Sequence, residues 1–124
     1  FTADGVEVET LELTDLGPPL RRHRDLPDGA NVTFVTPRGA SRLSVRSWER
    51  GVEAETLSCG SGVVAAAVVA ALLRGEAPPI TAATRSGSAL AVDFRIDGSL
   101  AKDVTLTGDA LFVFEGTLTE EVLG

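Results

Sequence analysis

The strongest chemical signal in the sequence comes from its single cysteine. Cys59 lies in the segment 55–62, which reads E-T-L-S-C-G-S-G and leads directly into an apolar stretch that predicts a helix. At a helix N-terminus, unpaired backbone N–H groups and the positive end of the helix dipole favour an anion. A cysteine in that place is favoured as the thiolate, which is the form that can act as a base.

The residues that follow Cys59 predict a binding site for a carboxylate. Gly60 and Gly62 have no side chains and leave the backbone amides open to a ligand, and Ser61 adds a hydroxyl donor. A substrate carboxylate can bind there as phosphate binds at other helix ends. The thiolate could then remove a proton from the carbon beside that carboxylate, while the amides stabilise the developing charge. This chemistry requires no metal and no cofactor.

A lone cysteine also has a plainer interpretation. Such a residue is more often a small buried apolar side chain than a catalyst. Glycines like those beside Cys59 are also common at helix starts. The residues alone therefore leave both interpretations open. If the thiol is catalytic, we expect it to be exposed in the isolated chain.

One helix must present this site. Residues 61–74 read S-G-V-V-A-A-A-V-V-A-A-L-L-R, a run longer than a typical strand. Gly75 stands where a C-terminal glycine cap belongs, and Pro78-Pro79 prevents continuation. Because this helix is apolar on every side, we expect it to be buried all round. A buried strand is the alternative, since valine favours strands.

Short antiparallel strands are expected to surround the helix. Alternating polar and apolar residues predict strands at 31–36 and 42–48, and further short strands separated by turn residues are expected at 80–85, 89–96, 104–106 and 110–115. Leu16–Pro19 and Leu26–Gly29 are interpreted as connections, because both are rich in residues that break regular structure.

Composition and charge exclude several classes of function. The chain has 124 residues, enough for one domain, and a hydrophobic fraction of 44%. Its net charge of -7 disfavours nucleic-acid and anionic-membrane partners, because phosphates require basic surfaces. No apolar run approaches the ~20 residues of a membrane span, and no signal peptide is evident. A single thiol suits a reducing compartment, so we expect a cytoplasmic protein.

Three groups of residues resemble the C-terminal half of the diaminopimelate epimerases. The first is W-E-R-G at 48–51, followed by E-T-x-x-C-G-S-G at 55–62 and the alanine-rich helix. The second is L-P-D-G-A-N-V at 26–32. The third is L-T-G-D-A at 106–110, which is similar to the L-T-G-P-A ending of that family. Together they cover nearly the whole chain.

The resemblance implies that Cys59 is one of two opposed cysteines, one of which removes the α-proton while the other returns it. It also implies that five residues contact the substrate, the last two through their amides: Asn31, Glu49, Arg50, Gly60 and Ser61. Glu49 and Arg50 could instead form an ordinary ion pair, and Asn31 could simply start a strand. Glu55 is left open between a substrate contact, a helix-entry contact and a solvated charge.

The family's fold and reaction follow as expectations from the resemblance. The fold class is α+β, with antiparallel strands curled into a barrel-like sheet around the central apolar helix. Residues 1–124 form a single domain, which is the C-terminal half of a protein with two pseudo-symmetric domains. The reaction is the epimerisation of LL- to meso-diaminopimelate without a cofactor. Because inversion by two bases needs a thiol on each face, the absent N-terminal domain is the expected partner; a homodimer is left open.

Two other functions remain open at this point. A related racemase for another amino acid could share the Cys59 region, because the contacts that select the distal part of the substrate are shared with the absent half. A non-catalytic relative could keep the carboxylate pocket as a binding module. Since the chain opens with Phe1 and contains no methionine, we expect it to be a piece of a longer protein.

Overall fold

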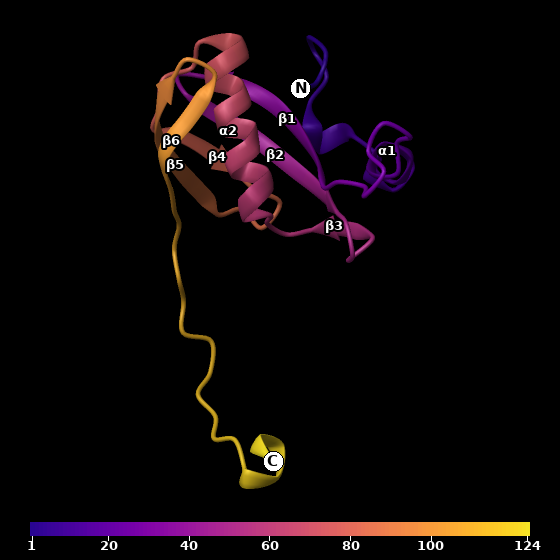
Figure 1. The fold of residues 1–124 in the computed structure, drawn as a ribbon, viewed down its shortest axis with the longest axis vertical. Coiled ribbons are helices and arrows are strands. Elements are labelled where there is room, and N and C mark those ends of the chain that lie inside the picture. Colours follow the sequence, from indigo (N-terminus) through magenta and orange to yellow (C-terminus); the bar gives the residue numbers. More distant parts are fainter.

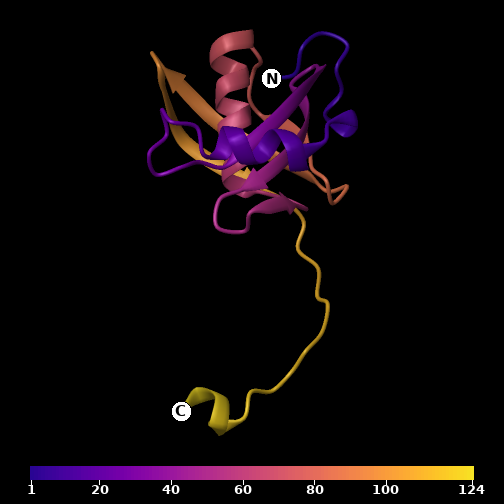
Figure 2. The ribbon, with the colours of Figure 1, turned by 90° about the vertical axis from the view of Figure 1, so that its right-hand side faces the viewer.

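The computed structural model describes residues 1–124, except for the side chain of Leu123. A six-stranded sheet carries the long helix on one face and the N-terminal helices on the other (Figure 1, Figure 2). The elements in chain order are η1 (Val8–Thr10), α1 (Leu13–Arg21), β1 (Val32–Gly39), β2 (Arg42–Glu49), β3 (Ala54–Thr56), α2 (Gly60–Arg74), β4 (Ile80–Ala83), β5 (Ala89–Asp97), β6 (Leu100–Thr107) and α3 (Glu120–Leu123).

The predicted α+β class is confirmed, but the sheet is mixed rather than wholly antiparallel. Its strand order is β1-β2-β4-β5-β6, with β3 pairing to β2. β2 and β4 run parallel because the chain crosses between them through α2, which returns it to the same end of the sheet. Among the described strands the sheet is open, with β1 and β6 as its edges. The barrel-like curl therefore stays a prediction.

The predicted helix is confirmed as α2. It ends at Gly75, whose φ of 70° lies in the left-handed region and whose N–H bonds back to the last turn. Its small side chains Val63, Ala67 and Ala70 are fully buried against the sheet. Across the interface they meet the large core residues of β2, β4 and β5, which are Leu43, Val45, Ile80, Val92 and Phe94.

The expectation that α2 is buried all round is wrong. Ser61, Ala65, Val69, Leu72 and Leu73 are exposed along one face, with Leu73 at 76% of its full exposure. The reason is that an open sheet covers only one side of a helix. Pattern alone cannot distinguish this arrangement, because the exposed face of α2 is as apolar as the buried one.

The N-terminal segment contains a helix that the sequence did not predict. Leu16–Pro19, interpreted as a connection, lies inside α1. Gly17 packs so closely on Trp48 that an added Cβ would lie 2.5 Å from the indole ring. A glycine before a proline also lacks the Cβ that normally clashes with the proline ring, so the helix continues into Pro18. Tertiary packing on β2 thus overrides the breaker residues.

The strand predictions are confirmed through β6 and wrong at 110–115. That segment forms no pairs and belongs to an extended tail that leads from β6 away from the body (Figure 1). The three-residue β3 was not predicted, because it is too short to show an alternating pattern. Among the described residues, no helix is long and apolar enough to cross a membrane.

The packing of α2 gives a first prediction. Ala67 is fully buried, whereas Ala65 on the same helix is exposed. We expect Ala67→Leu to lower the free energy of unfolding by ~1–3 kcal/mol, because the larger side chain overpacks the core. Ala65→Leu is the matched control and should change it by less than about 0.5 kcal/mol. Urea denaturation of both variants measures the difference, and equal effects would contradict the assignment of the buried face.

Candidate active site

The candidate site lies where β1 begins, β2 ends and α2 starts. Cys59 is the N-cap of α2: its backbone is extended, and its carbonyl accepts the first helical hydrogen bond from Val63 N–H at 2.9 Å. The predicted position of the thiol at a helix N-terminus is therefore confirmed. The backbone N–H groups of the first turn after it have no partner within the helix. The sulfur and these donors thus lie at the same end of the helix dipole.

Two polar side chains contact the sulfur. The Asn31 amide nitrogen lies 3.9 Å from Cys59 Sγ, and the Ser61 hydroxyl lies 3.5 Å from it. Both distances are within the range of hydrogen bonds to sulfur. The expectation that the isolated chain exposes the thiol is wrong, because only 6% of Cys59 is accessible.

The amide of Asn31 is oriented by a backbone donor. Its oxygen accepts the N–H of Arg50 at 2.8 Å, so its nitrogen is left to face the sulfur. The Asn31 N–H group can therefore donate a hydrogen bond to the sulfur. The structure therefore gives Asn31 a defined place beside Cys59, beyond starting β1.

Glu49 and Arg50 have different surroundings. Glu49 accepts the Thr56 hydroxyl at 2.6 Å, which ties the end of β2 to β3. Arg50 is exposed and contributes its backbone N–H to Asn31. In the part of the chain that the structure describes, no ion pair joins Glu49 to Arg50. The alternative of an ordinary ion pair is therefore not observed.

Two hydroxyls complete the floor of the site and were not predicted. Thr33 and Ser47 are opposite residues of β1 and β2 and share a hydrogen bond of 2.9 Å. Both lie under Gly62, where an added Cβ would clash with Thr33 Oγ1 and lie 3.0 Å from Ser47 Oγ and 3.2 Å from Cys59 Sγ. Strand alternation places Thr33 on the same face as Asn31, which is the one sequence signal that could have found it.

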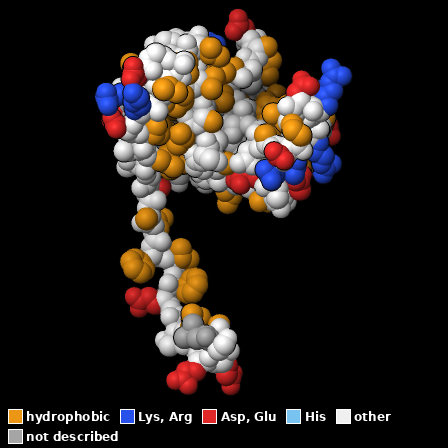
Figure 3. Space-filling view, viewed as in Figure 1, with side chains coloured by type: hydrophobic (Ala, Val, Ile, Leu, Met, Phe, Trp, Pro, Cys, Tyr) orange, Lys and Arg blue, Asp and Glu red, His pale blue; other side chains and the backbone are white. Residues whose placement is uncertain are grey.

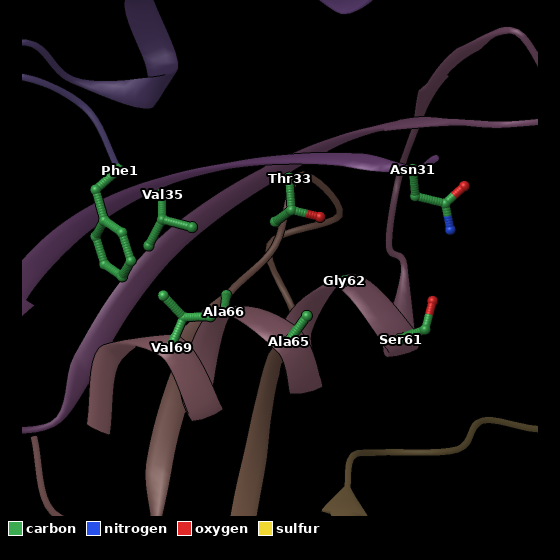
Figure 4. Close-up of a pocket in the computed structure, with 9 residues that line it drawn as sticks. All are labelled: Phe1, Asn31, Thr33, Val35, Ser61, Gly62, Ala65, Ala66 and Val69. Carbon is green, nitrogen blue, oxygen red and sulfur yellow. The ribbon is translucent and has the colours of Figure 1, made fainter. Parts of the chain in front are cut away.

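A hollow of about 390 Å³ opens beside these residues, between β1 and the exposed face of α2 (Figure 4). Its lining is polar at the end near the helix N-terminus and apolar at the other. The polar end holds Asn31, Thr33 and Ser61, and the apolar end holds Phe1, Val35, Ala65, Ala66 and Val69. This hollow leads away from the Cys59 region along the open side of α2.

Glu55, left open by the sequence, lies on the opposite face of the sheet. It forms a bidentate ion pair with Arg46, with N–O distances of 2.6 and 2.7 Å. These hydrogen bonds, together with the charge of the guanidinium, hold the pKa of the Glu55 carboxyl below its usual range. Glu55 therefore attaches β3 to Arg46 of β2, on the face of the sheet opposite to Cys59.

The chain is similar to known proteins over nearly its whole length. A family model described as diaminopimelate epimerase matches residues 2–113. The chain belongs to the diaminopimelate epimerase family. The diaminopimelate epimerase of Aquifex aeolicus is 45% identical over 99% of this chain, which covers 44% of that relative. Those of Chlorobaculum tepidum and Methanothrix thermoacetophila are 36% and 39% identical, over 90% and 94% of the chain. This member thus spans less than half the length of these relatives.

The tight contact at Gly62 predicts how a larger side chain there would affect the stability of this member of the diaminopimelate epimerase family. We expect Gly62→Ala to lower the free energy of unfolding by ~1–3 kcal/mol, because the new methyl group clashes with Thr33 Oγ1. Adding Thr33→Ala should recover part of that loss, since it removes the clashing oxygen. A double-mutant cycle from urea denaturation measures the coupling. Strict additivity of the two changes would contradict the contact.

The ion pair of Glu55 gives a pH-dependent prediction. The pKa of Glu55 is lowered in the folded protein, so its ion pair adds to the free energy of unfolding above the unfolded-state pKa, near 4.3. This contribution is lost as the pH falls through the pKa of Glu55 in the folded protein. We expect Glu55→Gln to lower the free energy of unfolding by ~1–3 kcal/mol at pH 7. The difference from wild type should shrink below about pH 4. Urea denaturation at both pH values tests this, with exposed Glu121→Gln as the control.

Proposed function

We propose that the protein to which residues 1–124 belong is a cofactor-independent epimerase that converts LL- to meso-diaminopimelate. The observation that carries this proposal is the position of Cys59, which caps α2 while Asn31 and Ser61 contact its sulfur. The names of the relatives support the substrate. Because the chain covers less than half of those relatives, the activity is proposed for the whole protein.

In this proposal the thiolate of Cys59 takes the α-proton of the bound amino acid. The substrate carboxylate binds the free amides of Gly60 and Ser61, which places the α-carbon next to the sulfur. The electron pair of the broken C–H bond moves toward that carboxylate, where the amides stabilise it. A second thiol returns a proton to the opposite face, and in the reverse direction the two thiols exchange roles. Glu49 and Arg50 are proposed as further substrate contacts.

The second thiol must come from outside these residues, since Cys59 is the single cysteine of the sequence. We therefore propose that residues 1–124 are the C-terminal one of two pseudo-symmetric domains. The N-terminal domain would close over the site from the side where Asn31 and Ser61 line the open hollow. A barrel-like closure of the sheet around α2 belongs to the same proposal, as does a cytoplasmic location. A homodimer stays open.

The tail supports the presence of such a partner. Leu111, Phe112, Val113 and Phe114 are each more than 80% exposed, and hydrophobic side chains follow one another along the tail (Figure 3). Successive residues of an extended chain point to opposite sides, so this segment is apolar on both faces. An extended segment of that kind is stabilised when both of its faces are buried. We propose that it packs into the second domain.

The experiment follows α-proton exchange and configuration in D₂O, using full-length protein and each pure diaminopimelate stereoisomer. We expect wild type to interconvert LL- and meso-diaminopimelate. Cys59→Ser should lose this activity by about 10²- to 10⁴-fold, because a serine hydroxyl is a poor base near neutral pH. Ser99→Ala, in the exposed turn between β5 and β6, is the control and should leave the rate unchanged.

Other outcomes of this experiment separate the alternatives. Activity on another amino acid alone would show a racemase with a different substrate. Binding of diaminopimelate without proton exchange would show a non-catalytic relative. Wild-type activity in Cys59→Ser would contradict the role of the thiol.

A further inference from the structure

Arg46 uses four hydrogen bonds to join three separate segments of the chain. It lies in the middle of β2, and its side chain is only 10% exposed. Its Nη1 donates to the carbonyls of Val8 and Leu11 at 2.7 and 2.8 Å. Its Nε and Nη2 donate to the two carboxylate oxygens of Glu55 at 2.6 and 2.7 Å. One guanidinium therefore fixes the N-terminal segment, β2 and β3 relative to one another.

The Arg46–Glu55 pair lies directly behind the candidate site. Side chains alternate across a strand, so Arg46 and Glu55 face the N-terminal segment, whereas their neighbours Ser47 and Thr56 face α2. Ser47 and Thr56 are paired across β2 and β3. The ion pair thus holds β3 from one face of the sheet, while the sulfur and its contacts lie on the other face.

β3 needs such an anchor because it is short. It has three residues and pairs with β2 alone. From its end at Thr56, only Leu57 and Ser58 separate it from Cys59, and both are exposed. Apart from β3, the backbone of this loop is held by one hydrogen bond, from the Ser86 N–H to the Leu57 carbonyl at 2.9 Å. The first turn of α2 fixes Cys59 on its C-terminal side, so on its N-terminal side the position of Cys59 depends on how firmly β3 is held.

We propose that Arg46 is a positioning residue for Cys59. By fixing β3 through Glu55, it keeps the sulfur between Asn31 and Ser61 and in reach of the α-carbon of a bound substrate. The catalytic part of this inference rests on the proposed function. A misplacement of about 1 Å can cost ~100-fold in rate, so loosening β3 affects turnover before it affects binding of the distant parts of the substrate.

The decisive variants keep the charge of Arg46 or Glu55 and change the geometry of the hydrogen bonds between them. Arg46→Lys retains the positive charge but cannot make the bidentate contact and two carbonyl bonds together. Glu55→Asp retains the negative charge on a shorter stem, and it serves if Arg46→Lys does not fold. Two controls separate positioning from general destabilisation. Val92→Ala removes fully buried bulk from β5, a strand that does not pair with β3, and Arg95→Lys alters an exposed arginine–carboxylate pair.

The first measurement is the alkylation rate of Cys59 by iodoacetamide in folded protein, at a temperature well below the unfolding transition. We expect Arg46→Lys or Glu55→Asp to raise this rate at least about 10-fold, because the loop opens locally. Val92→Ala and Arg95→Lys should leave it near the wild-type rate. An unchanged rate in the folded Arg46 and Glu55 variants, or an equal rise in Val92→Ala, would overturn the inference.

The second measurement is kcat and KM of the full-length protein with LL-diaminopimelate. We expect kcat to fall at least about 10-fold in Arg46→Lys while KM changes less than about 3-fold, because ground-state contacts remain while the base is displaced. Equal kcat in folded Arg46→Lys and wild type would also overturn the inference. If wild type itself is inactive, the proposed function fails, and the alkylation rates still decide whether Arg46 positions the thiol.

Discussion

The first turn of α2 lies against β1 and β2 at a separation that only a glycine permits. Thr33 and Ser47 occupy the space where a side chain at residue 62 would be, and the sulfur of Cys59 borders the same space. Protein interiors are close-packed, so a contact of this kind sets the distance between helix and sheet. Because Cys59 caps the helix, the same contact sets the height of the sulfur above the strands. The polar surroundings of the thiol follow from it.

Around this contact, the two faces of the sheet carry different kinds of side chain. On the face toward α2, small hydroxyl and amide side chains surround the sulfur. On the opposite face, Trp48 packs on Gly17, and Arg46 binds Glu55 and the N-terminal carbonyls. Because side chains alternate along β2, Ser47 faces the sulfur while its neighbours Arg46 and Trp48 face the N-terminal segment. The anchoring groups can therefore be bulky and charged, while the side chains around the sulfur stay small.

The fold leaves a large apolar surface exposed. α2 is exposed along Ala65 and Val69, both edges of the described sheet are open, and the tail carries bulky apolar residues such as Phe112 and Phe114 into solvent. Large contiguous exposed apolar surfaces mark interaction sites in proteins. In the proposed function the single thiol also calls for a second chain segment, since inversion of a stereocentre by two bases requires one base on each face. The exposed apolar surface and the proposed chemistry are both consistent with the second domain proposed above.

The sequence by itself determined the ends of α2, most of the strands and the place of the thiol, because each depends on nearby residues. Gly75 and two prolines end α2, period-two alternation marks β1, β2, β4 and β5, and the C-G-S-G segment places the thiol at a helix start. The family resemblance followed from the same short motifs. Each of these depends on residues within a few positions of one another, so pattern and propensity suffice.

Only the tertiary structure decided the features that depend on distant residues. Gly17 and Pro18 break helices locally, yet α1 forms because Gly17 packs on Trp48. The apolar pattern of α2 is the same on every side, so only the extent of the sheet decides which face is buried. The tail has the apolar run of a buried strand but no partner among the described residues. Asn31 reaches Cys59, and Arg46 reaches Glu55, because strand pairing brings them together. Strand pairing and packing act between segments far apart in the chain, which no short motif records.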